Sequence, residues 1–294
     1  MPPSVISASP VLRKAPAQEK GGCTLCPRKC GASRPARSGL CGAGNLRVAS
    51  YNLHFGEEPP VSGTNGSGTI FFSGCPLKCI FCQNYPISHF NNGKDMTVDE
   101  LAAVILELQN RGAHNINLVT PTQFAVEIKE AIIRARGKGL KIPVVYNSSG
   151  YERVEILKEL EGTVDIYMPD AKYATPEISG RYCEVPDYPE INKKALIEMK
   201  RQVGDLYLEN GIASRGILVR HLVLPGEIEN SKQVLKWLFE NLGNVYLSLM
   251  SQYHPCHKAV GHPVIGRRLK EEEYEEVLNF ADGLGVTNGY RQEN

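Results

Sequence analysis

Three cysteines in one short stretch constrain this chain more than any other feature. They occupy residues 73–84 as Cys75-x3-Cys79-x2-Cys82, directly after the apolar run 69–72. Three thiolates can hold three irons of a cubane iron–sulfur cluster, and one loop can wrap it. Such clusters usually have four cysteine ligands. The spacing therefore predicts a 4Fe–4S cluster at Cys75, Cys79 and Cys82, with one iron open to another ligand.

Length, charge and composition limit the number of domains, the partners and the compartment of the protein. The chain has 294 residues, enough for one large domain or for a domain plus an appendage. Its net charge of +1 gives no strong nucleic-acid signal. No apolar run approaches the roughly 20 residues of a membrane-spanning helix, and the first residues show no signal peptide. Nine cysteines in such a chain indicate metal ligands rather than disulfides. We expect a cytoplasmic protein without a membrane partner.

The N-terminal part differs from the rest of the chain in composition. Residues 1–22 hold four prolines and no apolar period, which predicts a mobile arm. Residues 23–63 form a Gly- and Pro-rich segment that ends in short strands. The cysteines of this segment are Cys23, Cys26, Cys30 and Cys41. The segment is too poor in apolar residues to form a core, so a metal would staple it. A zinc ion, an auxiliary iron–sulfur cluster and a metal-free loop remain as alternatives.

Strands alternate with helices over residues 64–294. The predicted strands cover 69–73, 116–119, 143–146, 164–168, 216–224 and 245–250. The predicted helices cover 97–111, 122–136, 151–160, 191–207, 231–241 and 270–282, the first of them with a capping box from Thr97 to Glu100. This order implies a parallel sheet with right-handed crossovers. Six strands are too few for a closed eight-stranded barrel, so we predict an α/β fold with a partial (βα)6 TIM-like barrel.

Polar residues follow these strands repeatedly, where parallel βα folds place their chemistry. They are Thr120-Pro121-Thr122, Asn147-Ser148-Ser149-Gly150, Asp170 and Lys172, Arg220-His221, and Gln252-Tyr253-His254. A ring of hydroxyl, amide and charged groups suits a zwitterionic ligand that carries a ribose. The sequence therefore predicts one binding site at the carboxyl ends of the strands.

The motif Cys75-x3-Cys79-x-Phe81-Cys82 after a first strand resembles that of the radical S-adenosylmethionine (SAM) superfamily. Within it, the chain is similar to the branch of unassigned substrate related to pyruvate formate-lyase activating enzyme, from about residue 68 onward. The resemblance implies that SAM binds the open iron and is cleaved to a 5′-deoxyadenosyl radical that abstracts hydrogen. It also implies an electron donor such as flavodoxin or ferredoxin, and a protein or small-molecule substrate.

The same resemblance assigns SAM contacts to particular positions. Met168-Pro169-Asp170-Ala171-Lys172 is similar to the family's Met-x-Asp-x-Lys segment, and Asn147 begins the run where the family carries Asp-Thr-Asn-Gly. The family's Gly-Gly-Glu run is replaced here, so Thr120 or Thr122 would serve the methionine amino group. The implied SAM-binding residues are Phe81, Thr120, Asn147, Ser148, Asp170, Lys172, His221 and His254.

Two classes of function are therefore compared. The first is an oxidoreductase of the radical SAM type, acting on a glycyl radical enzyme, another protein or a small molecule. The second is an iron–sulfur electron-transfer or zinc-stapled binding module without SAM chemistry. The second accounts for the four N-terminal cysteines, but it explains neither the strand-end polar groups nor the open iron. We therefore expect the enzyme.

Overall fold

The computed structural model describes residues 22–34, 36 and 39–292. The arm predicted at 1–22 thus lies outside the described residues, apart from Gly22. The strands are β1 (Arg47–His54), β2 (Ser67–Phe72), β3 (Lys94–Asp95), β4 (Ile116–Val119), β5 (Val144–Ser148), β6 (Ile166–Pro169), β7 (Tyr207–Glu209), β8 (Ile212–Leu222), β9 (Tyr246–Met250) and β10 (Gly289–Arg291). The helices are α1 (Pro59–Ser62), α2 (Tyr85–Ser88), α3 (Val98–Asn110), α4 (Ala125–Gly137), α5 (Val154–Leu160), α6 (Pro176–Cys183), α7 (Tyr188–Val203), α8 (Ile228–Leu242) and α9 (Glu271–Leu284).

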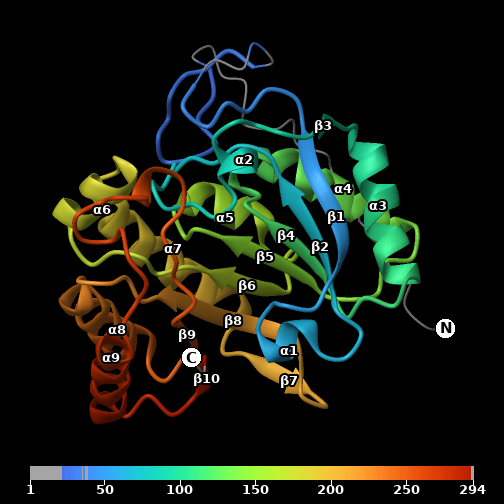
Figure 1. Ribbon diagram of the computed structural model, residues 1–294. Helices are drawn as coiled ribbons and strands as arrows, with labels where there is room; N and C mark the ends of the chain where they lie inside the picture. The colour runs from blue at the N-terminus through green and yellow to red at the C-terminus, as the bar shows by residue number, and fades with distance from the viewer. Residues whose placement is uncertain (1–21, 35, 37–38, 293–294) are drawn as a thin grey trace.

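One sheet organises the molecule (Figure 1). Its strands follow the order β10-β9-β8-β6-β5-β4-β2-β1-β3, and β7 pairs with β8 at the side. The six predicted strands correspond to β2, β4, β5, β6, β8 and β9, which are all parallel. No strand pairing in the described part of the chain joins β3 to β10, so the barrel stays open. The predicted partial barrel is confirmed.

Alternate residues of each strand face opposite sides of the sheet. Ile116 and Leu118 pack in the core beneath α3 and α4, so Asn117 between them faces the inner side. On the other half of the sheet, Ile217 and Val219 pack in the core that also contains buried residues of α7 and α8. The helices therefore cover the outer face, and the inner residues line a lumen.

A short insertion closes the amino end of this lumen. Val61, on α1, is fully buried against Val145, Ile166 and Leu218, which lie on the inner faces of three neighbouring strands. Asn115 Nδ2 donates to Val61 O at 2.7 Å and fixes the insertion. The lumen is thus plugged below and approached from the carboxyl ends of the strands.

The structure differs from the predicted elements in two places. The strand region expected before residue 63 is one long strand, β1, which pairs antiparallel with β2 and joins the main sheet. The helix predicted over 191–207 begins earlier, at Tyr188, and ends at Val203, because Gly204 adopts φ +74°. The chain then forms the β7–β8 hairpin around Asn210 and Gly211, which both have positive φ as such a tight turn requires.

Residues 22–46 contain no helix or strand among their described positions. This Cys-rich segment, blue in Figure 1, lies above α2 near the carboxyl end of β2. No helix that the structure describes is long and apolar enough to cross a membrane.

Candidate active site

The predicted cluster loop follows β2 and is tied to α2. Gly74 has φ +83°, and its N–H donates to Ile87 O at 3.0 Å. Lys78 also adopts a left-handed conformation, with φ +58°, and its Nζ donates to Ser88 O at 2.7 Å. Because both contacts are made by one short stretch, the three cysteines lie on a tight turn at the carboxyl end of β2.

The three thiols of the loop are close enough to affect one another's pKa. Burial, together with the neighbouring Cys79 and Cys82 thiols, raises the pKa of Cys75 to about 12. Burial and the Cys79 thiol likewise raise the pKa of Cys82. Among the described residues, no three Cys, His, Asp or Glu side chains converge as the ligands of a single ion do. A cubane takes one thiolate at each iron, so three neighbouring but separated sulfurs fit it.

Side chains from the next elements hold two of these thiols. Cys82 Sγ lies 3.1 Å from Ser88 Oγ on α2. A hydrogen bond with the Cys183 thiol is the main cause that raises the pKa of Cys79. Cys183 itself donates to Ser179 O at 3.0 Å. Cys183 matches no ligand pattern in the sequence, yet α6 delivers it beside the cluster loop.

A buried row of charges lies next to the cysteines. Lys172 Nζ is 2.7 Å from Asp170 Oδ2, and Arg220 Nη2 is 2.9 Å from Asp170 Oδ1. Arg220 Nη2 also donates to Asn147 Oδ1 at 2.7 Å. The side chains of Asp170 and Lys172 are only 13% and 19% exposed, so they are not a surface pair. Although burial raises the pKa of Asp170, Arg220 and Lys172 hold it below its usual value.

This row reaches the cluster loop on one side. The Lys172 ammonium is among the groups that act on the pKa of Cys79, which it lowers, after the larger raising effects of the Cys183 hydrogen bond and burial. It has the same lowering effect on the pKa of Cys82, where burial is the largest cause. The structure therefore brings together the predicted cluster ligands and the predicted Asp170–Lys172 pair.

On the other side, the row reaches two glutamates that precede α1. Arg220 Nη1 lies 3.7 Å from Glu57 Oε2, and Arg220 Nε lies 4.0 Å from Glu58 Oε1. Burial is the main cause that raises the pKa of Glu57. Glu58 is 7% exposed, and its Oε2 has no hydrogen-bond partner in the described part of the molecule. The pair stands in the loop before α1, and the packing of α1 into the lumen, which has no local signal in the sequence, brings it to Arg220.

The two threonines after β4 have different roles. Thr122 is almost fully buried, and its Oγ1 donates to Glu152 Oε1 at 2.6 Å. Thr120 adopts φ +58°, a strained conformation for a β-branched residue. Its N–H donates to Asn147 O at 2.9 Å. Of the two, Thr120 is the one that lies half-exposed beside the charged row.

Glu152 is a titratable residue that sequence reasoning missed. Burial raises its pKa to about 7, although hydrogen bonds from Thr122 and Ser148 oppose this shift. Tyr146 OH also approaches Glu152 Oε2 at 3.5 Å. The acid follows the Asn147–Gly150 turn. Gly150 has φ +69°, and a Cβ there would lie 2.4 Å from Asp170 O, so only glycine fits the turn.

Three further residues that were predicted to contact SAM lie in or near the cluster loop or at the end of β5. Phe81 is 7% exposed, with its ring edge-on to Tyr253 at 5.7 Å. His254 Nδ1 is 3.2 Å from Gln83 Nε2, beside the cluster loop. Ser148 is buried, and its Oγ accepts from Gly150 N at 3.2 Å.

His221 is not brought to this group. It is fully buried on the outer side of β8, where Nε2 lies 2.9 Å from Ser231 Oγ on α8 and Nδ1 lies 2.6 Å from Ala171 O. Burial lowers the pKa of His221 to about 4, so the ring is neutral. Arg220, its neighbour on β8, takes the inner position instead.

The four N-terminal cysteines lie beside the cluster loop. Burial raises the pKa of Cys26 to about 12, and the thiols of Cys41, Cys23 and Cys30 contribute to that shift. Burial also lowers the pKa of Lys78, and the thiols of both cysteine groups oppose this shift, among them Cys41 and Cys75. The Lys78 ammonium thus lies close to both groups of thiols.

Comparison with known proteins agrees with this geometry. The model of the radical SAM superfamily matches residues 69–238. The uncharacterised protein MJ0674 of Methanocaldococcus jannaschii is 30% identical over 270 residues, which cover 88% of this chain and 74% of that protein. Pyruvate formate-lyase 1-activating enzyme of Escherichia coli (strain K12) is 22% identical over 67% of this chain and 78% of its own length.

Solved structures share the fold. Streptococcus suis SuiB bound to the precursor peptide SuiA has a TM-score of 0.52 and 13% identity, over 75% of this chain and 46% of SuiB. Methylornithine synthase (PylB) has a TM-score of 0.50 and 15% identity, over 74% of this chain and 68% of PylB. The chain spans about half the length of SuiB, and both likenesses concern the fold.

The molecule is an open barrel with a three-cysteine loop at the end of its first parallel strand and a buried row of charges beside that loop. The chain belongs to the radical SAM superfamily, with weak homology to pyruvate formate-lyase activating enzyme. Membership implies a 4Fe–4S cluster and SAM, and the thiols and charges described above fit both groups.

Proposed function

We propose that this chain binds a 4Fe–4S cluster at Cys75, Cys79 and Cys82 and abstracts a hydrogen atom from a protein or peptide substrate, such as the glycine of a glycyl radical enzyme. When bound, the cluster and SAM supply the reductive cleavage that yields the 5′-deoxyadenosyl radical. A flavodoxin or ferredoxin would supply the electron. A small-molecule substrate is the alternative.

The observation that supports this proposal most strongly is the buried Asp170–Lys172 pair next to the cluster loop. Lys172 Nζ lies 2.7 Å from Asp170 Oδ2, in a position where both charges are largely removed from water. Such a pair can hold the carboxylate and ammonium groups of one zwitterion, because each partner already fixes the other. Arg220, which also donates to Asn147, keeps Asp170 oriented from the far side.

Two relatives favour a protein or peptide substrate. One is named pyruvate formate-lyase 1-activating enzyme, and the other, SuiB, was solved with a precursor peptide. PylB, named a methylornithine synthase, keeps the small-molecule alternative open.

All nine cysteines are free thiols in the structure, which supports a reducing compartment such as the cytoplasm.

The test is anaerobic turnover of reconstituted full-length protein with dithionite and SAM. We expect 5′-deoxyadenosine to form, and a glycyl radical signal to appear when a matching glycyl radical enzyme is added. The triple variant Cys75→Ala, Cys79→Ala and Cys82→Ala should form none, whereas Lys236→Ala, at an exposed lysine on α8, should behave as the wild type. Intact SAM in the wild type, with iron bound, would instead support an electron-transfer or zinc-stapled module.

A further inference from the structure

The N-terminal cysteines are gathered by a hairpin-like turn. Cys23 N donates to Ala32 O at 3.0 Å, and Gly31 N donates back to Cys23 O at 3.1 Å. Lys29 N donates to Cys26 O at 3.1 Å and closes the tip of the turn. Three of the four thiols therefore lie on one tight turn, as in many thiolate metal sites.

The chain returns to this turn at Gly39, two residues before the fourth thiol, Cys41. A Cβ at Gly39, which has φ +123°, would lie 3.0 Å from Cys30 Sγ, so the chain passes directly over Cys30 just before it reaches Cys41. Ala43 N then donates to Cys41 Sγ at 3.4 Å. The backbone alone thus places all four thiols in one neighbourhood.

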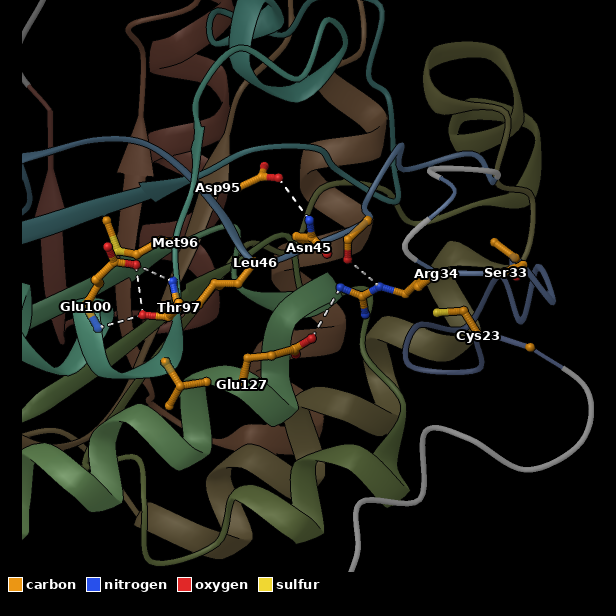
Figure 2. Close-up of a pocket in the computed structure, with 14 residues that line it drawn as sticks. Cys23, Ser33, Arg34, Asn45, Leu46, Asp95, Met96, Thr97, Glu100 and Glu127 are labelled. Atoms are coloured by element: carbon orange, nitrogen blue, oxygen red, sulfur yellow. Dashed lines mark hydrogen bonds and ion pairs between the residues drawn. The ribbon is translucent and has the colours of Figure 1, made fainter.

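The Cys-rich segment is held to the barrel by a few buried side chains and hydrogen bonds: Leu25 lies in one core cluster, and Cys41, Ala43 and Leu46 lie in the core beneath α3 and α4. It has no helix or strand in its described part, and a cavity of about 760 Å³ separates it from α3 and α4. Figure 2 shows Arg34 reaching across to Glu127 on α4, at 3.4 Å. Arg34 Nη1 also donates to Gln123 O at 3.0 Å. Without a helix or strand in its described part, the segment depends on these contacts, and a staple within it would add rigidity.

The cluster loop is in direct contact with this segment. Arg28 Nε donates to Pro76 O at 3.0 Å, within the loop. A Cβ at Gly74 would lie 2.5 Å from Cys41 O, so the two backbones touch there. Gln123, the residue held by Arg34, donates from Nε2 to Gly74 O at 3.1 Å. The position of the loop that carries Cys75 therefore depends on the shape of the Cys-rich segment.

We propose that Cys23, Cys26, Cys30 and Cys41 bind a thiophilic metal centre, and that this centre braces the loop of the SAM cluster. A zinc ion and an iron–sulfur cluster share the thiolate chemistry that the four side chains offer. The four side chains do not converge on one point as single-ion ligands do, but each thiol turns about one bond, so metal binding closes the site. The bracing role rests on the proposed cluster at Cys75; the metal centre itself does not.

The first measurement is zinc and iron per chain in full-length protein purified without oxygen. The triple variant Cys75→Ala, Cys79→Ala and Cys82→Ala should keep about one zinc or about four irons. Adding Cys26→Ser and Cys41→Ser should remove that metal. Electron paramagnetic resonance after dithionite reduction separates the two forms, since only a cluster gives a signal. A triple variant without bound metal would overturn the proposal, whatever its effect on SAM cleavage.

The second measurement is hydrogen exchange of the loop amides at residues 73–82. The Cys26→Ser, Cys41→Ser variant should exchange at least about tenfold faster there, while the central strand β5 stays protected. Arg28→Gln keeps all four thiols, so it should retain the metal and still speed up exchange in the loop. Arg201→Gln, at an exposed arginine on α7, is the control and should match the wild type. Wild-type protection of the loop in both the cysteine and Arg28 variants would refute the bracing role.

Discussion

Arg220 Nη2 lies 2.9 Å from Asp170 Oδ1, inside the barrel, and this contact joins two parts of the chain that the sequence keeps apart. Through it, the carboxylate that pairs with Lys172 is connected to the two glutamates of the α1 insertion. Three buried carboxylates share two cations in this row. Arg220 contacts all three, so its loss would leave buried charge unpaired, which is costly.

The first prediction concerns SAM affinity. Asp170→Asn removes the charge that fixes Lys172 and keeps the shape of the side chain. We expect SAM binding to weaken about tenfold, a loss of ~1.4 kcal/mol, while the visible spectrum of the cluster stays intact. Equilibrium dialysis with labelled SAM gives the dissociation constant. Glu159→Gln, at an exposed carboxylate that pairs with Lys129 on the surface, is the control; equal affinity in Asp170→Asn and wild type would contradict this role.

The second prediction concerns stability. Arg220→Met leaves Asp170, Glu57 and Glu58 without their shared cation, so the free energy of unfolding should fall by about 3–5 kcal/mol. Denaturant titration followed by circular dichroism measures it. Arg134→Met is the matched control, because the Arg134 side chain is 39% exposed and contacts two exposed carboxylates, Asp99 and Glu130. The control should lose only about 0–1 kcal/mol; similar losses in both variants would show that the buried row has no special role.

The third prediction is a pH dependence. Burial raises the pKa of Glu152 in the folded protein to about 7, from an ordinary 4.5. The unfolded chain therefore releases this proton first, and the free energy of unfolding should fall as pH rises from 4.5 to 7. The shift amounts to about 3 kcal/mol in total. Glu152→Gln should be free of this fall, so its stability relative to the wild type should rise with pH.

Denaturation curves at pH 5 and pH 8 provide the comparison for Glu152. Glu159→Gln is the control, because this side chain is 59% exposed and pairs with Lys129 at the surface. The control should follow the wild type at both values. A constant stability difference between Glu152→Gln and wild type across this range would show that Glu152 titrates normally.

The fourth prediction concerns the strained Thr120. Glycine adopts φ +58° without penalty, so Thr120→Gly should raise the free energy of unfolding by about 1 kcal/mol. We expect SAM binding to weaken at the same time, because the family resemblance assigns the Thr120 hydroxyl to the methionine amino group and glycine lacks it. Thr122→Val should do the opposite, losing stability with the hydrogen bond to Glu152 while SAM affinity changes less. Normal SAM affinity in Thr120→Gly would remove Thr120 from the cofactor site.

Much of the architecture follows from local patterns in the sequence. The alternation of six strands with helices corresponds to what the structure shows. The capping box is confirmed: Thr97 N donates to Glu100 Oε2 at 2.7 Å, and Glu100 N donates to Thr97 Oγ1 at 3.2 Å. These features depend on neighbours within a few residues, so the sequence carries their signal directly.

The parts that escaped prediction depend on distant packing. Glu57 and Glu58 reach Arg220 only because Val61 enters the lumen, about 160 residues from Arg220 in the chain, and no local pattern records that contact. The sequence also did not show which residues of β8 face the lumen. Its residues from Ile217 to Leu222 are apolar at both faces apart from Arg220 and His221, as in a strand covered on both sides, so alternation did not show which of these two faces the site.

The most direct test of the account is the electron paramagnetic resonance spectrum of the reduced, reconstituted protein with and without SAM. The account places an iron without a protein ligand at Cys75, Cys79 and Cys82, beside the Asp170–Lys172 pair. We therefore expect SAM to shift the cluster spectrum in a saturable way, and this shift to require higher SAM concentrations in Asp170→Asn. A fully formed cluster whose spectrum is unchanged by saturating SAM would contradict the assignment.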